Sequence, residues 1–153
     1  NIEVSQIKGK NNWALLLDPD GFITEGTGDN FFIVKNGKIL TPEGRNILRG
    51  ISRDYIFTLA EELNIPCKDC NIYPYDVYTA DEAFMTATPF CILPTVSLQG
   101  IKIGNGKMGN ITTTLLRKWS ENVGLDIQGQ IQEYGKEVEY LNSGHSTPYQ
   151  FNR

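Results

Sequence analysis

The sequence has 153 residues, a formal net charge of −4, and 40% hydrophobic and 21% charged residues. This length and composition predict one globular domain with its own core. The acidic balance argues against a nucleic-acid partner, which normally meets a basic patch, and no apolar stretch approaches the length of a membrane span.

The three cysteines, Cys67, Cys70 and Cys91, are odd in number and lack the spacing of a disulfide framework. They predict reduced thiols and a cytoplasmic protein. Cys67 and Cys70 form a C-x-x-C pattern, but a redox pair needs a helix N-terminus to lower a thiol pKa, and this pair leads from a helix into a strand. A zinc site would need a second ligand pair, and His145 is the only histidine, so we predict no metal site.

The first elements predicted in the chain are two short strands. Residues 1–12 carry apolar positions without a helix cap before them, and we expect them to be the end of a truncated upstream segment. Residues 13–17 then form an apolar run that ends at a turn over residues 18–21, and residues 22–24 form a second strand.

A hairpin follows these strands. Residues 31–34 and 38–40 flank Asn36 and Gly37, and Asn-Gly between apolar runs is the strongest short hairpin signal. Residues 41–44, Thr-Pro-Glu-Gly, are expected to break the sheet.

The clearest predicted helix covers residues 52–63. Ser52 is suited to cap it, Asp54 matches the positive first turn, and apolar residues recur at helical spacing. Asn64 and Pro66 are expected to end it.

The rest of the chain continues as strands and one more helix. Residues 65–72 and 83–86 favour strands, and residues 92–98 are expected to pair with residues 101–103. Residues 110–123 favour a helix that stops at Gly124.

We expect one domain over residues 13–133, followed by a polar C-terminal tail over residues 134–153. The many hairpins and few helices predict a mixed α+β fold.

Residues 24–30 place two acids and two glycines in a turn between apolar strands. Polar residues and glycine populate ordinary turns, but this turn is long for its position, and its glycines permit close approach by a ligand. The residues alone leave both interpretations open.

Residues 48–52 open the helix that begins near Ser52. Free backbone N–H groups at a helix N-terminus, together with the positive end of the helix dipole, form an anion site. A plain Ser-capped helix start is the alternative, and Arg53 fits either interpretation.

Residues 80–89 combine an acidic turn, a short strand and a hydroxyl-rich end. Thr88 is suited to bind a phosphate oxygen or simply to finish the strand. Asp81 and Glu82 are adjacent on an extended segment, where neighbouring side chains point in opposite directions. We therefore expect them to satisfy backbone donors in a turn rather than to act as a catalytic pair.

Residues 104–109 match G-x-G-x-x-G and precede a helix, so a dinucleotide site has to be weighed. The glycines follow a hairpin rather than a strand that opens a βαβ unit, and Asp126 precedes its candidate strand instead of ending it. The context therefore argues against a dinucleotide site.

Taken in order, these segments resemble the class IV aminotransferases, the fold-type-IV enzymes that use pyridoxal 5′-phosphate (PLP). The family includes branched-chain aminotransferase, D-amino-acid aminotransferase and aminodeoxychorismate lyase. The resemblance covers residues 13–123, and it implies that the chain is the C-terminal large domain of such an enzyme. The matching stretches are DPDGFITEGTGDNFF (18–32), GKILTP (37–42), LRGISR (48–53), ADEAF (80–84) continued to Thr88, and the segment 103–112.

The resemblance implies the following cofactor-binding roles. Glu25 would bond the pyridine nitrogen of PLP and keep it protonated, which makes the ring a better electron sink. Leu48 would pack on the ring face, and Gly28 would line the phosphate neighbourhood. The backbone N–H groups of Ile51 and Ser52, with the hydroxyl of Thr88, would hold the phosphate.

The sequence departs from the family in two places. The Schiff-base lysine of the family lies on a strand well upstream of the Glu-Gly turn, and neither Lys8 nor Lys10 has that setting, so we expect it upstream of this chain. The chain by itself is therefore expected not to transaminate. Branched-chain enzymes also bind the substrate carboxylate with a backbone N–H after the Thr88 position, and Pro89 has none.

The resemblance implies an aminotransferase that moves an amino group between an amino acid and a 2-oxo acid, of branched-chain type, and a homodimer. An aminodeoxychorismate lyase-like enzyme and a non-catalytic binding domain remain as alternatives. A lysine followed closely by Asn-Tyr in the upstream sequence would separate the enzymes from the binding domain.

Overall fold

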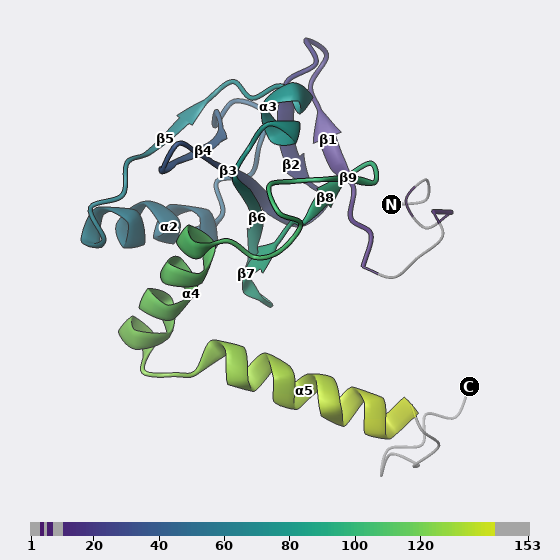
Figure 1. Cartoon of the computed structure of the whole chain (residues 1–153), viewed down its shortest axis with the longest axis vertical. Coiled ribbons are helices and arrows are strands. Elements are labelled where there is room, and N and C mark those ends of the chain that lie inside the picture. Colours follow the sequence, from purple (N-terminus) through teal and green to yellow (C-terminus); the bar gives the residue numbers. More distant parts are fainter. Residues whose placement is uncertain (1–3, 5, 8–10, 143–153) are drawn as a thin grey trace.

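The computed structural model describes residues 4, 6, 7 and 11–142, with side chains up to residue 136. Figure 1 shows a twisted sheet with helices packed around it and a last helix that extends away from the sheet. The strands are β1 (Leu15–Leu17), β2 (Ile23–Gly26), β3 (Asn30–Lys35), β4 (Lys38–Pro42), β5 (Cys67–Cys70), β6 (Glu82–Ala87), β7 (Cys91–Pro94), β8 (Ser97–Leu98) and β9 (Ile101–Lys102). The helices are α2 (Ile51–Glu62), α3 (Pro74–Tyr78), α4 (Asn110–Val123) and α5 (Ile127–Asn142).

Within the described residues, seven strands form one sheet and β8 pairs with β9 in a small hairpin. The path runs β1-β2-β3-β4-β5, and β6 pairs with both β3 and β7. Only the β4–β5 pair is parallel, and α2 forms the crossover between these two strands. The resulting mixed sheet with few helices agrees with the expected α+β class.

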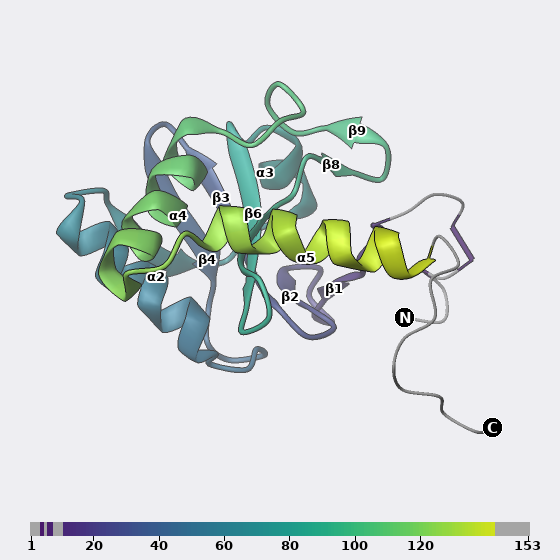
Figure 2. The same ribbon diagram turned by 90° about the horizontal axis from the view of Figure 1, so that it is seen from below.

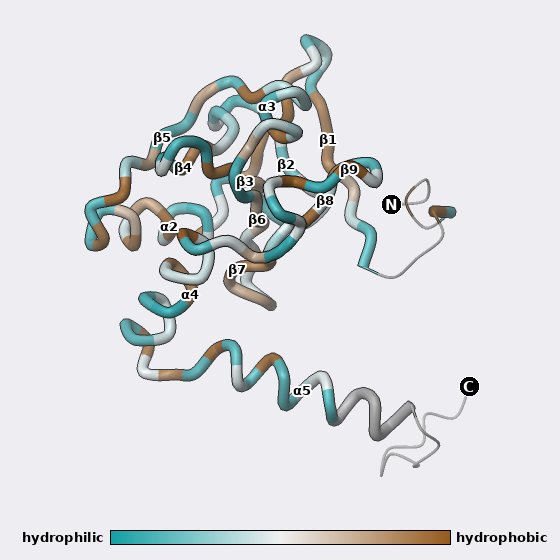
Figure 3. The backbone as a smooth tube through the Cα atoms, in the orientation of Figure 1, coloured by the Kyte–Doolittle hydropathy of each residue, from teal (hydrophilic) through white to brown (hydrophobic). Residues whose placement is uncertain are grey.

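The central strand β3 is buried on both faces, which explains its unbroken apolar run. Phe32 and Val34 belong to one core cluster, and Phe31 and Ile33 belong to the other. In the first cluster, the rings of Phe32 and Phe84 stack with centroids 4.9 Å apart. Figure 3 shows hydrophobic segments alternating with hydrophilic ones along the chain, in the helices as well as in the strands.

Helices α2 and α4 cover the first of these faces. Leu59 of α2 and Leu115 of α4 are fully buried in the same cluster, and Trp119 packs edge-on against Tyr55 at 4.9 Å. The second face is closed by the residues around α3, including Ile72 and Val77. Helices α2 and α4 also contact each other, and Figure 2 shows them close together on one side of the molecule.

Helix α5 was not predicted. Ile127 is buried against the first cluster, while Ile131 and Tyr134 are 43% and 57% exposed. The helix crosses the expected boundary after residue 133, so the polar residues that suggested a tail continue a helix instead. Residues 143–153, most of the expected tail, lie outside the described residues, as do Lys8 and Lys10.

Three local predictions were wrong in detail. Pro42 does not break the sheet, because β4 continues through it beside β5. Residues 92–98 do not form one strand paired with residues 101–103, since β7 pairs with β6 and only β8 pairs with β9. Ser52 does not cap α2, because the N-cap is Gly50, which makes no side-chain capping bond.

Within the described part of the chain, no helix is long and apolar enough to cross a membrane.

Candidate functional site

The hairpin between β2 and β3 presents Glu25 next to its turn. Glu25 and Asn30 are paired across the two strands, and the N–H of Gly26 donates to the carbonyl of Asp29 at 3.0 Å. Oε2 of Glu25 accepts hydrogen bonds from the N–H of Leu48 at 2.9 Å and from Nδ2 of Asn30 at 3.1 Å. The half-buried carboxylate is therefore held in one orientation by donors from two segments.

Helix α2 begins beside this carboxylate. The N–H of Asp54 is the first to donate to a helical carbonyl, that of Gly50, so the N–H groups of Ile51, Ser52 and Arg53 have no acceptor within the helix. Gly50, the N-cap residue, has no side chain that could cap them. The positive end of the helix is thus available to an anion.

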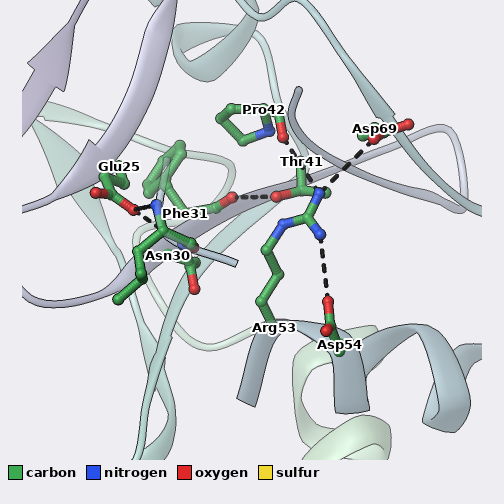
Figure 4. Close-up of polar contacts among 9 residues, drawn as sticks. Glu25, Asn30, Phe31, Thr41, Pro42, Arg53, Asp54 and Asp69 are labelled. Atoms are coloured by element: carbon green, nitrogen blue, oxygen red, sulfur yellow. Dashed lines mark hydrogen bonds and ion pairs between the residues drawn. The ribbon is translucent and has the colours of Figure 1, made fainter. Parts of the chain in front are cut away.

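The Arg53 side chain fixes this helix start but stays out of the site. Its guanidinium is buried and donates to the carbonyl of Pro42 at 3.4 Å, and it lies 3.5 Å from Asp54 and 3.9 Å from Asp69 (Figure 4). It also packs over the ring of Phe57. Arg53 therefore joins α2 to β4 and β5.

The turn between β6 and β7 supplies the third wall. Thr88 and Pro89 lie in this turn, and Cys91 follows in the left-handed region with φ of 57°. Thr86, the last buried residue of β6, has a hydroxyl that is buried without a hydrogen-bond partner among the described residues. A buried hydroxyl without a partner is costly to the folded chain.

These three segments enclose an open cavity of about 270 Å³. The structure brings all six predicted residues together along it, and their role in binding stays a prediction. Leu48 and Ile51 are 75% and 89% exposed, so the cavity has an apolar rim open to solvent. Its lining is formed by Glu25, Thr27, Gly28, Asp29, Asn30, Leu48, Gly50, Ile51, Ser52, Thr86, Ala87, Thr88 and Pro89.

Asp29 is a second acid on this lining, and it is 6% exposed. Burial, and then the nearby charge of Glu25, raise the pKa of Asp29 from 3.8 to about 6. The N–H of Gly28 opposes part of this increase in the pKa. Neither carboxylate oxygen makes a well-aligned hydrogen bond to another described residue. The cavity therefore carries one carboxylate held by donors and one that is not.

Sequence reasoning assigned no individual role to Asp29, Asn30 or Thr86. Their only local signal was a polar residue beside an apolar strand run, which is equally typical of a plain turn. Their importance comes from the pairing of Asn30 with both Glu25 and Thr86, which joins two strands distant in sequence.

The cavity is chemically polarised. N–H donors and a helix dipole lie at the start of α2, and carboxylates lie at the end of the β2–β3 hairpin. Such a site suits a ligand with an anion at one end and a protonated nitrogen at the other. A pyridinium ring with a phosphate group has this charge pattern.

The start of α4, which follows the G-x-G-x-x-G segment, is occupied by the chain itself. Glu82 accepts hydrogen bonds from the N–H groups of Ile111 and Thr112 at 2.9 and 2.8 Å and from the Thr112 hydroxyl at 2.7 Å. A side chain at Gly109 would overlap this carboxylate. Glu82 stands where a pyrophosphate would need to bind, and Asp81 likewise accepts from the N–H of Asn36 at 2.7 Å.

The cysteines lie apart from this site and are free. Burial raises the pKa of Cys67 to about 12 and also raises the pKa of Cys70 and of Cys91. Thiols of this kind are poor nucleophiles at neutral pH. In the part of the chain that the structure describes, no three or more His, Cys, Asp or Glu side chains cluster as metal ligands would.

Comparisons with known proteins point to one family. Residues 5–98 match the family described as amino-transferase class IV. The chain is 41% identical over 117 residues to the branched-chain-amino-acid aminotransferase of Pseudomonas aeruginosa. The aligned region covers 76% of this chain and 38% of that enzyme.

Solved structures agree with these sequence relatives. The branched-chain amino acid aminotransferase of Escherichia coli superposes with a TM-score of 0.70 and 36% identity, over 80% of this chain and 41% of that one. The enzyme of Thermobaculum terrenum, solved in its PLP-form, superposes with a TM-score of 0.69 and 33% identity, over 76% and 39% of the two chains. The chain thus spans about two-fifths of the length of these relatives.

Proposed function

Because the chain belongs to the class IV aminotransferase family, we propose that it forms the PLP-gripping part of an aminotransferase that moves an amino group between a branched-chain amino acid and a 2-oxo acid. One observation carries this proposal. The start of α2, whose N-cap is Gly50, lines the same cavity as the Glu25 carboxylate, which accepts two hydrogen bonds. A ligand with a phosphate and a protonated pyridine nitrogen requires this arrangement.

Six of the lining residues have a proposed role that their geometry suits. Oε2 of Glu25 is already held by two N–H donors, so the carboxylate is fixed as an acceptor that faces a ring N–H. The N–H groups of Ile51 and Ser52 and the hydroxyl of Thr88 bind the phosphate. The exposed Leu48 side chain gives an apolar contact to the ring, and Gly28 has open space where a side chain would stand.

When bound, PLP supplies an electron sink for the substrate α-carbon. The residues of this chain bind and orient the cofactor, and Glu25 holds a proton at the ring nitrogen. Among the described residues that line the cavity there is no lysine. The lysine that forms the Schiff base with PLP in the proposed enzyme is thus not one of these described lining residues.

A homodimer in the cytoplasm completes the proposal. Several large apolar side chains are exposed at the cavity rim and elsewhere, which is typical of surfaces that pack against another part of an assembly. Sedimentation of the chain at high concentration would test this point, and a clean monomer would contradict it.

The function is tested by retention of PLP and by amino transfer. We expect the chain to retain PLP weakly, and the substitution Glu25→Gln to weaken that retention at least tenfold, since a charged acceptor contributes about 1.5–3 kcal/mol. Glu61→Gln, at an exposed position of α2, is the matched control. The full-length protein that contains this chain should form glutamate from leucine and 2-oxoglutarate. Equal PLP retention by the Glu25 variant and the original, or no amino transfer, would contradict the proposal.

A further inference from the structure

Asn30 lies at the centre of the site, at the first position of β3, and is 5% exposed. Its Nδ2 donates to Oε2 of Glu25 at 3.1 Å and to the carbonyl of Leu48 at 2.8 Å. The N–H of Leu48 donates to the same carboxylate oxygen at 2.9 Å. These three hydrogen bonds close a ring, and Figure 4 shows the Asn30 amide directed at Glu25.

The other atom of the amide contacts the helix start. A side chain at Gly50 would bring its Cβ to 2.5 Å from Oδ1 of Asn30, so the amide packs directly on the N-cap of α2. The backbone of Asn30 is itself fixed, because it pairs with Glu25 on one side and Thr86 on the other. One side chain thus touches both ends of the cavity.

We propose that Asn30 is a positioning residue that fixes the Glu25 carboxylate relative to the start of α2, so that one ligand can reach both. The inference rests on the proposed function and deepens it, since it assigns the span between the two binding ends to one amide. Asn30 acts through Glu25 and through the segment from Leu48 to Gly50.

The amide is needed because its two contacts accept hydrogen bonds. Asn30→Asp keeps the size of the side chain but sets oxygen atoms against the Glu25 carboxylate and the Leu48 carbonyl. Asn30→Ala removes the donor and leaves both acceptors without it. The aspartate variant should therefore be worse than the alanine variant, which would not hold if only volume mattered.

Asn122 offers a matched control elsewhere in the chain. Its Nδ2 donates to Oε2 of Glu62 at 3.0 Å and to the Tyr55 hydroxyl at 3.1 Å, so it joins α4 to α2 with the same chemistry. Neither of its partners lines the cavity.

Two ligands test the proposal by calorimetry on the 153-residue chain. Pyridoxine 5′-phosphate has the ring nitrogen and the phosphate but no aldehyde, and inorganic phosphate occupies only the helix start. We expect Asn30→Ala to weaken pyridoxine 5′-phosphate binding about tenfold and Asn30→Asp about a hundredfold, with phosphate binding weakened less than threefold. Asn122→Ala and Asn122→Asp should change neither affinity by more than twofold. Equal losses for both ligands, or no loss, would overturn the proposal.

Hydrogen exchange in the ligand-free chain gives a second measurement. The Leu48 N–H is held by Glu25, and Asn30→Ala should speed its exchange at least fivefold while the Asn122 variants leave it unchanged. Unchanged exchange at Leu48 would overturn the positioning role even if every variant binds poorly. If the unaltered chain binds pyridoxine 5′-phosphate no better than phosphate, the proposed function fails, and the exchange rates still decide whether Asn30 holds this segment.

Discussion

The N-termini of α2 and α4 are built alike and used differently. Both helices begin after a glycine N-cap with no side-chain capping bond from that residue, and both pack on the same face of the sheet. At α4, the Glu82 carboxylate binds the first N–H groups. At α2, the corresponding groups border the cavity.

The chain itself binds the first N–H groups of α4, whereas those of α2 face a cavity that is large enough for a ligand. Glu82 lies 29 and 30 residues before the N–H groups that it binds. The glycine-rich pattern precedes α4, whose start is filled, whereas a less conspicuous segment precedes α2. The sheet decides which of the two starts is open, because β6 carries Glu82 to one of them.

The largest expected effect is on the filled helix start. Glu82→Ala removes a carboxylate that accepts three hydrogen bonds, one of them from the buried Thr112 hydroxyl, and should lower the free energy of unfolding by about 2–3 kcal/mol. Urea denaturation measures the change, with Glu61→Ala as the control. A loss below about 0.5 kcal/mol would show that Glu82 does not cap α4.

Asp29, the buried acid near α2, should lower the stability of the folded chain at neutral pH, whereas Glu82 should raise it. Because the pKa of Asp29 is raised to about 6 in the folded chain from 3.8, the folded state holds this proton more tightly than the unfolded state. The Asp29 contribution to the free energy of unfolding should therefore fall as pH rises from about 4 to about 6, and stay low above it.

Asp29→Asn removes this penalty. It should stabilise the chain by about 1–2 kcal/mol at pH 7 and by much less at pH 4, as measured by denaturation at both values. Destabilisation at pH 7 would mean that Asp29 has a partner that stabilises its charged form.

The space around each start can be probed with an added methyl group. At Gly109 a Cβ would overlap Glu82, so Gly109→Ala should lower the free energy of unfolding by about 1 kcal/mol or more. At Gly28, on the cavity side, nothing lies within 4 Å of the added Cβ, and Gly28→Ala should be neutral within about 0.5 kcal/mol. Equal losses at the two positions would contradict the difference between the sites.

The smallest expected effect concerns Ser52. The sequence favours it as the cap of α2, and loss of a serine cap costs about 0.5–2 kcal/mol. In the structure Ser52 lies inside the first turn after Gly50. Ser52→Ala should therefore change the free energy of unfolding by less than about 0.5 kcal/mol, as measured by thermal denaturation. A larger loss would indicate that its hydroxyl does cap the helix.

Local chemistry made much of the fold predictable. Asn36 and Gly37 both have positive φ in the hairpin that their dipeptide predicted, and α4 spans the predicted residues with Gly124 in the left-handed region. Helix α2 differs from the prediction by one residue at each end. In these places short-range preference and tertiary structure agree.

Long-range contacts were not predictable from one sequence. Glu82 caps a distant helix, and Asn30 bonds the carbonyl of Leu48 18 residues later, yet neither residue differs locally from a polar residue beside a strand. The six candidate site residues were named through family resemblance, and only the sheet pairings bring them to one cavity. Helix α5 was missed because polar residues dominate it, and Ile131 and Tyr134 are exposed rather than buried.

We expect the start of α2 to bind anions and the start of α4 not to bind them. Titration of the ¹⁵N-labelled chain with inorganic phosphate, followed through backbone amide shifts, distinguishes the two helix starts. We predict saturable shifts at Ile51 and Ser52 and none at Ile111 and Thr112, whose N–H groups are held by Glu82. Shifts of equal size at both helix starts, or at α4 alone, would contradict this expectation.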